Sequence, residues 1–257
     1  MKNFIKYPGG KYYLKSWIIS HFPSDYQSRI YIDSTIGGGA VLLEKKKSKL
    51  EIASDINPEL IALWNLVKNN PEELSNELKK IPYSPESFEL AKKKHYPEGI
   101  NEYVLRRMSR GAMCSTFAWS KRLRGNQPGD INAWFNSIKY ITKIHERVKD
   151  VMFVERDFRD TMLSLNGANT FLYVDPPYVT STRTKGIYGQ YEMVDKDHTE
   201  FLVLANSFQG KMLISGYDSK LYNDKLGNWN KEYKEIVNHS GQNKVKQKRV
   251  EVLWKNY

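Results

Sequence analysis

Cysteine is almost absent from this sequence, since Cys114 is the only one among 257 residues. A single thiol excludes a disulfide framework and any metal cluster built on several cysteines. The five histidines are scattered without the paired spacing of metal ligands, so no metal site is predicted. No apolar run approaches the roughly 20 residues that span a bilayer, and the first ten residues lack the apolar core of a secretory signal. We therefore expect a cytoplasmic protein without a membrane partner.

Positive charge and aromatic side chains are present in excess. Lys and Arg number 40 against 29 Asp and Glu, which gives a formal net charge of +11. An excess of this size favours a polyanionic partner, because phosphate contacts supply most of the non-specific affinity for nucleic acid. Aromatic residues make up 13% of the chain. They suit stacking on bases, but taken alone this aromatic content is better explained by an aromatic-rich core.

Hydrophobic patterning alternates between strands and helices in both terminal parts of the chain. Buried strands are expected at 29–33, 50–54, 151–154, 170–174 and 211–215, with a final pair near 234–237 and 249–254. Helical spacing occurs at 11–21, 40–47 and 59–69. The opening order of strand, glycine loop, helix, strand and helix predicts an α/β fold with a doubly wound, Rossmann-like sheet.

The middle of the chain follows another pattern. Residues 70–149 show helical patterns and loops, punctuated by five prolines, and no convincing buried strand. The economical interpretation is one α/β catalytic domain in two pieces, 1–69 and 150–257, with a helical insert at 70–149.

A glycine-rich loop follows the first predicted strand. Gly37, Gly38 and Gly39 lie between that strand and a helix, where glycine lets the backbone approach a ligand and the helix N-terminus offers N–H groups. Asp55 comes 22 residues after Asp33, at the end of the next strand, where an acid commonly holds a ribose. The pattern indicates an adenosine-bearing ligand, either a dinucleotide or S-adenosylmethionine. A tight turn with a solvated acid is the alternative, and the departure from G-x-G-x-x-G lowers the dinucleotide option.

The most specific string is Asp175-Pro176-Pro177-Tyr178, directly after the predicted strand at 170–174. The exocyclic amine of adenine is a poor nucleophile because its lone pair is delocalised into the ring. The Asp175 carboxylate and the Pro176 carbonyl can accept hydrogen bonds from this amine, and two prolines hold the acceptors rigidly. Tyr178 can stack on a base that has flipped out of the duplex. A capped Pro-Pro turn explains less, because the string follows both a buried strand and a nucleotide loop.

Motifs in chain order resemble the D12 class of N6-adenine-specific DNA methyltransferases, the class that includes Dam and its phage relatives. They lie at 7–11 (YPGGK), 33–41 (DSTIGGGAV), 54–58 (SDINP), 147–158, 175–178 (DPPY) and 249–254 (RVEVLW). The string at 175–178 matches the family's catalytic tetrad outright. One departure is that Ser34 and Thr35 stand where the family usually has Pro-Phe.

The resemblance implies transfer of a methyl group from S-adenosylmethionine to N6 of a flipped adenine in double-stranded DNA. It implies a catalytic role for Asp175, Pro176, Pro177 and Tyr178. Together with the glycine loop, it implies cofactor contacts from Tyr7, Lys11, Gly37, Gly39, Asp55, Asp157 and Asp175, with Asp157 beside the adenine of the cofactor. Lys11 can meet the cofactor carboxylate, and Tyr7 can pack against its flat or sulfonium parts.

Basic residues crowd one part of the predicted insert, with aromatic residues between them. The set expected to contact DNA is Arg106, Arg107, Arg110, Trp119, Lys121, Arg122 and Arg124. Arg reads guanine edges and clamps phosphates, and aromatic side chains wedge into a base stack. A solvated basic face explains any one of these residues, but the cluster as a whole favours a target-recognition segment.

Three alternatives remain open from the sequence. Methylation of an RNA adenine or of a protein glutamine amide needs similar acceptors around a planar nitrogen. The basic insert, and an Asp rather than an Asn at the start of the tetrad, favour DNA. A catalytically silent DNA-binding relative is the third alternative, against which the intact tetrad argues. A cognate restriction enzyme is a further expected partner if the chain serves a restriction–modification system.

Overall fold

The computed structural model describes residues 1, 4–120, 122–124, 126–182, 188–237 and 248–257. Contacts divide the chain into two compact units. Unit 1 comprises Met1–Ile19, Ile36–Lys45 and Asn57–Glu155, and unit 2 comprises Ser20–Thr35, Lys46–Ile56 and Arg156–Tyr257. Residues 70–149 all lie in unit 1. The insert boundaries expected from the sequence, at 69 and 150, stay a prediction.

Unit 1 is mainly helical. Its helices are α1 (Lys15–Ser20, whose last residue belongs to unit 2), α2 (Ala40–Glu44), α3 (Pro58–Asn69), α4 (Pro71–Lys80), α5 (Pro85–Lys92), α6 (Ile100–Met108), α7 (Gly129–Lys139) and α8 (Ile141–Val148). The unit also contains the strand β5 (Met152–Glu155), the short antiparallel pair β3 (Leu123–Arg124) and β4 (Gln127–Pro128), and the 3₁₀ turn η2 (Arg110–Ala112).

The helix starts in unit 1 follow directly from the sequence. Helices α3, α4 and α5 each begin with a proline, whose fixed φ and missing N–H suit the first helical position. Asn57 caps α3 by accepting hydrogen bonds from two backbone N–H groups, and Ser84 caps α5 in the same way with one. The prolines that punctuate the middle of the sequence therefore begin helices as well as interrupting them.

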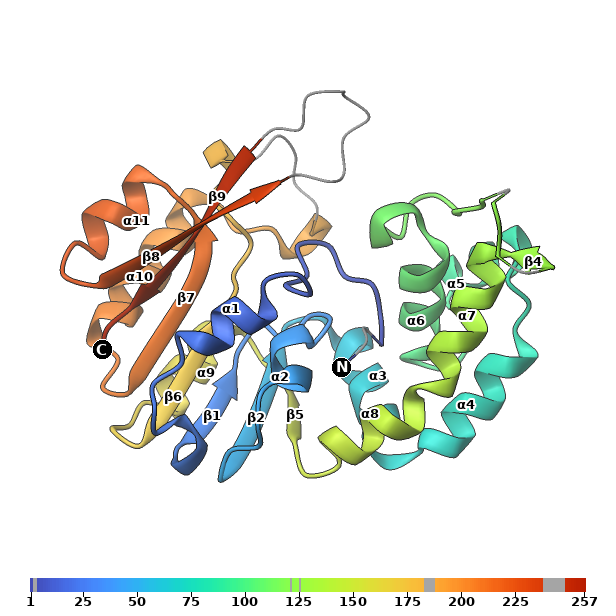
Figure 1. The fold of residues 1–257 in the computed structure, drawn as a ribbon, viewed down its shortest axis with the longest axis horizontal. Coiled ribbons are helices and arrows are strands. Elements are labelled where there is room, and N and C mark those ends of the chain that lie inside the picture. Colours follow the sequence, from blue (N-terminus) through green and yellow to red (C-terminus); the bar gives the residue numbers. More distant parts are fainter. Residues whose placement is uncertain (2–3, 121, 125, 183–187, 238–247) are drawn as a thin grey trace. The chain divides into compact units, whose positions relative to one another are not determined.

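Unit 2 contains the remaining strands of the large sheet. They are β1 (Ile30–Asp33), β2 (Leu50–Asp55), β6 (Thr170–Val174), β7 (Lys211–Tyr217), β8 (Asn230–Val237) and β9 (Lys248–Lys255). The helices are α9 (Phe158–Ser164), α10 (Asp195–Ser207) and α11 (Lys220–Lys225), with 3₁₀ turns η1 (Tyr26–Ser28), η3 (Thr180–Thr182) and η4 (Gly189–Tyr191). The seven-stranded sheet has the order β5-β2-β1-β6-β7-β9-β8 (Figure 1). This architecture confirms the predicted α/β fold, and every predicted strand is present.

The strand register brings four strand ends together at one edge of the sheet. Strand β1 pairs in parallel with both β2 and β6, so that Asp33 lies opposite Ala53 and Tyr173. Strand β7 continues the parallel part, with Ile214 opposite Val174. The chain winds outward from β1 in both directions, and the carboxyl edge at such a switch point is where ligands bind in open α/β sheets.

One face of the sheet in unit 2 is covered by α9, α10 and α11. Buried side chains from β1, β6, β7 and β9 pack against these helices in a single hydrophobic cluster. Its members include Ile32, Leu172, Ile214 and Trp254 from the sheet and Phe158, Phe201 and Tyr222 from the helices. This core fixes the carboxyl ends of the strands. Within the described ranges, no helix is both long and apolar enough to cross a membrane.

Candidate active site

Asp175 is held in place from two neighbouring strands. It follows β6 directly and is half-buried. The Ser215 hydroxyl on β7 donates a hydrogen bond to Asp175 Oδ1 at 2.8 Å. Because Ser215 donates its proton to Asp175, the Tyr173 hydroxyl, 3.1 Å from Ser215 Oγ, is the donor in the bond between these two hydroxyls. The backbone N–H of Asp175 donates to Thr35 Oγ1, just after β1, at 2.8 Å. Both the backbone and the carboxylate of Asp175 are thus fixed at the sheet edge.

Thr35 stands where the family usually has the Phe of its Pro-Phe loop, and it makes a contact that depends on its hydroxyl. Its hydroxyl ties the loop after β1 to the first residue of the tetrad, a bond that a phenylalanine at this position would not make.

Replacing Thr35 by Val keeps the side-chain shape but removes the acceptor of the Asp175 N–H. We expect the free energy of unfolding, measured by urea titration, to fall by about 1–2 kcal/mol, because a backbone donor loses its partner. We also expect slower methyl transfer. Thr35→Ser is the matched control, since it keeps the hydroxyl. Equal stability of the Val and Ser variants would contradict the assigned role.

Three carboxylates gather at the carboxyl ends of β1, β2 and β6. We call Asp33, Asp55 and Asp175 the carboxylate cluster. Asp33 is only 2% exposed, and burial raises its pKa to about 7, with further increases from the negative charges of Asp175 and Asp55. Tyr31 donates a long hydrogen bond to Asp33 Oδ2 at 3.4 Å, while Oδ1 is buried without a hydrogen-bond partner among the described residues. Such a cluster favours a cationic ligand.

The last residue of the tetrad is anchored to the antiparallel part of the sheet. The Tyr178 hydroxyl donates a hydrogen bond to the Glu251 carboxylate on β9. The pKa of Tyr178 lies well above its usual range, because of burial first and of the nearby Glu251 and Asp175 carboxylates second. The Tyr178 ring meets the Tyr217 ring edge to face, with centroids 4.5 Å apart and planes at 71°. The ring orientation is therefore fixed from two sides.

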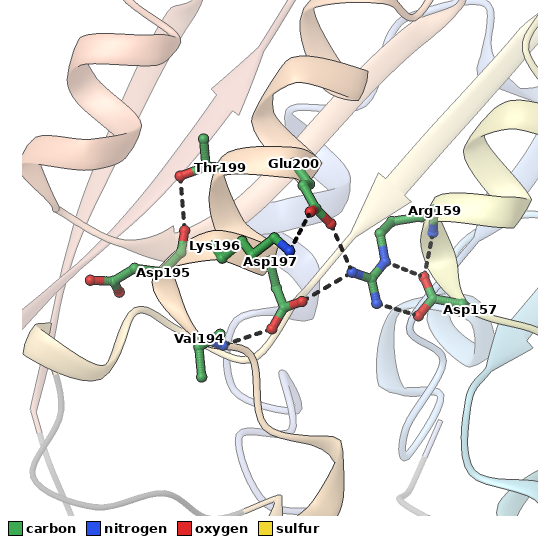
Figure 2. A network of polar contacts seen from close by, with 8 residues as sticks. All are labelled: Asp157, Arg159, Val194, Asp195, Lys196, Asp197, Thr199 and Glu200. Carbon is green, nitrogen blue, oxygen red and sulfur yellow. Dashed lines mark hydrogen bonds and ion pairs between the residues drawn. The ribbon is translucent and has the colours of Figure 1, made fainter.

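Asp157, the predicted contact to the cofactor adenine, caps helix α9. Its Oδ1 accepts the backbone N–H of Arg159 at 2.8 Å. Its carboxylate also receives Nε and Nη2 of Arg159 at 2.9 and 2.8 Å. Arg159 Nη1 continues to Asp197 at 3.0 Å and Glu200 at 3.3 Å on α10 (Figure 2). Burial alone would raise the pKa of Asp157, but the hydrogen bonds from Arg159 outweigh it and lower that pKa. Asp157 is thus an ionised acceptor with a fixed orientation.

The glycine loop is tightly enclosed by aromatic side chains of unit 1. Gly37 and Gly39 have positive φ angles of 46° and 65°, which glycine adopts without strain. A Cβ on Gly37 would lie 3.0 Å from Tyr7 Cδ1, and a Cβ on Gly39 would lie 2.7 Å from Trp64 Cζ2. Trp64 Nε1 also donates to the Gly37 carbonyl at 3.1 Å. The positive φ angles favour glycine at both positions, and at Gly39 the contact with Trp64 also leaves no room for a Cβ.

Lys11 and Tyr7 complete the set of predicted cofactor residues in unit 1. Lys11 is buried, and its Nζ donates to the Gly9 carbonyl at 2.9 Å. The Arg106 guanidinium lies over the Tyr7 ring, 4.5 Å from its centroid. The candidate residues thus fall into two groups. Tyr7, Lys11, Gly37 and Gly39 lie in unit 1, and Asp55, Asp157 and the tetrad lie in unit 2.

The residues expected to contact DNA differ in exposure. Arg106 donates to Glu102 and to the Ala112 carbonyl at 2.8 and 2.9 Å. Arg107 is buried, and its Nη2 donates to the Ala133 carbonyl at 2.7 Å. These contacts give both residues a structural role within unit 1. Arg110, Trp119 and Arg122 are exposed. Arg124 lies in β3, and Lys121 lies outside the described residues.

Four residues at this sheet edge were not among the sequence-based candidates: Asp33, Thr35, Ser215 and Glu251. Glu251 left the clearest signal, because it is a charged residue inside the apolar run 250–254. Asp33 was noted only as a strand end. Ser215 has no local signal, since its role depends on the pairing of β6 with β7. No group of three His, Cys, Asp or Glu side chains suited to a metal occurs in the described part of the chain.

Comparison with known proteins identifies the family of the chain. The model of the D12 class N6 adenine-specific DNA methyltransferase family matches residues 7–249. The chain belongs to this family. It is 26% identical to the type II methyltransferase M.MjaIII of Methanocaldococcus jannaschii, over 77% of this chain and 76% of that protein. It is 25% identical to the DNA adenine methylase of Haemophilus influenzae, over 84% of this chain and 80% of that protein.

The chain also has a weak likeness to a solved structure. This is an S-adenosylmethionine-dependent methyltransferase from Agrobacterium tumefaciens, with 8% identity and a TM-score of 0.42, covering 96% of this chain and 62% of that one. Because the TM-score is below 0.5, it carries no argument. The D12 family assignment thus depends on the sequence match over nearly the whole chain.

Proposed function

We propose that this D12 family member moves a methyl group from S-adenosylmethionine to N6 of an adenine flipped out of duplex DNA. The observation that carries the proposal is the fixed geometry of Asp175 at the end of β6, held by Ser215 through its carboxylate and by Thr35 through its backbone. A carboxylate oriented in this way is a preorganised acceptor for an exocyclic amine.

The tetrad makes the amine nucleophilic by accepting its two hydrogen bonds. A carboxylate offers about four acceptor sites, so Asp175 can bind the N6 amine while Ser215 holds Oδ1. The Pro176 carbonyl is the second acceptor. With both N–H groups directed to acceptors, the nitrogen becomes pyramidal and its lone pair points toward the methyl donor. Asp175 is also the group that can take up the proton that the amine loses. Tyr178 stacks on the flipped base.

The carboxylate cluster fits the charge of S-adenosylmethionine, which carries a sulfonium and an ammonium group and supplies an electrophilic methyl group when bound. Asp33 Oδ1 is buried without a hydrogen-bond partner in the described part of the chain. It is therefore suited to accept a hydrogen bond from a cationic group of the ligand. Asp55 at the end of β2 is proposed to hold the ribose hydroxyls, and Asp157 the adenine amine. In unit 1, Lys11 is proposed to bind the carboxylate and Tyr7 the flat or sulfonium parts, next to Gly37 and Gly39.

Duplex DNA is the proposed partner, with Arg110, Trp119 and Arg122 as its exposed contacts in the 70–149 segment. The net charge of +11 supports a polyanionic substrate. Lys121 and Arg124 belong to the same proposal by their position in the sequence. A cytoplasmic location and a cognate restriction enzyme also stay predictions.

Arg110→Gln and Arg122→Gln are each expected to weaken DNA binding and to reduce the slope of log K against log salt by about 1. Each change removes one cation that neutralises a phosphate. Fluorescence anisotropy with a mixed-sequence duplex at several salt concentrations measures the effect. Lys79→Gln, an exposed cation on α4, is the matched control, and an equal change in that variant would contradict a local DNA contact.

Labelled methyl transfer tests the proposed function directly. The purified chain is incubated with labelled S-adenosylmethionine and, separately, duplex DNA, RNA and protein, and the DNA products are digested to nucleosides. N6-methyladenine from DNA is the expected product. Transfer to RNA or protein alone would support one of the other methyltransferase classes. Cofactor-independent DNA binding without transfer would support the silent relative.

A further inference from the structure

Glu251 is a buried carboxylate within the otherwise apolar run 250–254. It lies on β9, where it is 1% exposed, and its neighbours Val252, Leu253 and Trp254 are fully buried. Its register partners are Tyr217 at the end of β7 and, on the other side, Lys234 of β8. Burial of a carboxylate is costly, and a well-packed apolar side chain at such a position is often more stable. Glu251 therefore calls for an explanation beyond the stability of the sheet.

The contacts of Glu251 lead to the tetrad. Its carboxylate accepts the hydrogen bond of the Tyr178 hydroxyl, and a charge-assisted bond of this kind is stronger and more directional than a neutral one. The Tyr178 ring also rests against the edge of Tyr217. Tyr217 in turn is held by Arg249 of β9, whose Nη1 lies 3.2 Å from the Tyr217 hydroxyl and whose guanidinium lies 5.3 Å from the ring centroid.

These contacts fix both ends of the Tyr178 side chain. The double-proline backbone fixes where the side chain begins, since Pro176 is buried and Pro177 is half-buried. Glu251 fixes the hydroxyl at the far end. A ring held at both ends cannot swing about its side-chain torsions, whereas a ring held only by its backbone can. A Tyr178 ring with a fixed plane determines the position and orientation of the flipped base that stacks on it.

We propose that Glu251 is a positioning residue that holds the ring of Tyr178 in the plane on which the target adenine stacks. The inference rests on the proposed function, because it assigns to Tyr178 the role of contacting the base. The proposal gives Glu251 no direct contact with the base or the methyl donor. Its effect therefore passes through the Tyr178 hydroxyl and concerns the orientation of the amine more than the affinity for S-adenosylmethionine.

The test compares Glu251→Met with Glu251→Gln in labelled methyl transfer to mixed-sequence duplex DNA. Met keeps the length of the side chain without an oxygen acceptor, whereas Gln keeps an acceptor. Misorientation of a reacting group by about 1 Å costs on the order of 100-fold in rate. We expect Glu251→Met to lower kcat by about 10- to 100-fold with the KM for S-adenosylmethionine unchanged, and Glu251→Gln to restore most of the activity.

A double-mutant comparison separates positioning from a purely structural role. Tyr178→Phe removes the hydroxyl and keeps the ring, so its kcat should fall by a factor similar to that of Glu251→Met. Because both changes remove the same hydrogen bond, between the Tyr178 hydroxyl and Glu251, the double variant should be no slower than the slower single variant. The proposal would be overturned if the double variant lost kcat by the product of the two single losses, or if Glu251→Gln were as slow as Glu251→Met. A purely structural role would lower the melting temperature without this coupling in kcat.

Two further results decide the remaining cases. If Glu251→Met does not fold, Tyr178→Phe decides alone, since wild-type kcat in that variant overturns the inference. If the wild-type chain transfers no methyl group to adenine, the proposed function and the inference fall together. An active wild type with an equally active, folded Glu251→Met variant overturns the inference alone.

Discussion

Asp175→Ala is expected to lower kcat for methyl transfer to DNA by about a thousandfold, the size of effect found when one preorganised electrostatic group is removed from an active site. The variant loses the acceptor that makes the adenine amine nucleophilic. Asp175→Asn should be less severe, because an amide oxygen still accepts a hydrogen bond while the negative charge is gone. Single-turnover rates with saturating labelled cofactor measure both effects.

DNA affinity provides the internal control for these Asp175 variants. Binding to a mixed-sequence duplex should stay close to wild type, because removal of a carboxylate takes away no phosphate contact. Asp224→Ala, an exposed carboxylate on α11 paired with Lys220, should be fully active. Normal turnover in folded Asp175→Ala protein would show that the tetrad does not supply the acceptor, and the proposed mechanism would be wrong.

The tetrad and the strand ends could be read from the sequence because they are local patterns. Strand β6 is five consecutive buried residues followed by Asp-Pro-Pro-Tyr, and a buried parallel strand is expected as an apolar run. Asp55 was found in the same way, as an acid at a strand end. Each of these signals lies within one short segment.

The partners of the tetrad could not be read, because they come from segments that meet only in the folded sheet. Ser215 reaches Asp175 across 40 residues of sequence, and Glu251 reaches Tyr178 across 73. A pattern of charged residues in the sequence also does not show which of their side chains are buried. Arg107 was predicted as a DNA contact like Arg110, yet only Arg110 is exposed, because α6 directs the Arg107 guanidinium to a backbone carbonyl.

Asp33→Asn is expected to stabilise the fold at pH 8 and to leave it almost unchanged near pH 3.5. The pKa of Asp33 rises from an ordinary 3.8 to about 7 on folding, mainly through burial. Between these two values the folded chain binds more protons than the unfolded chain, so stability falls as pH increases through this range and the loss is complete above about pH 7. A shift of this size corresponds to roughly 4 kcal/mol.

Urea unfolding at several pH values between 4 and 8 measures this effect. The difference in unfolding free energy between Asp33→Asn and wild type should grow as the pH increases to about 7 and then level off. A constant difference across the range would mean that folding does not shift the pKa of Asp33, and its burial would then carry no electrostatic cost.

The ionisation of Asp33 also predicts how the affinity for S-adenosylmethionine should depend on pH. A ligand cation beside Asp33 would lower its pKa, so affinity for S-adenosylmethionine should increase between pH 6 and pH 8 in the wild type. Asp33→Asn should lose that pH dependence and bind the ligand more weakly, although it is the more stable protein. Isothermal titration with S-adenosylmethionine at pH 6 and pH 8 tests this. The ionised Asp33 carboxylate would then lower the stability of the fold and increase its affinity for a cationic methyl donor. Functional sites often lower the stability of a protein in this way.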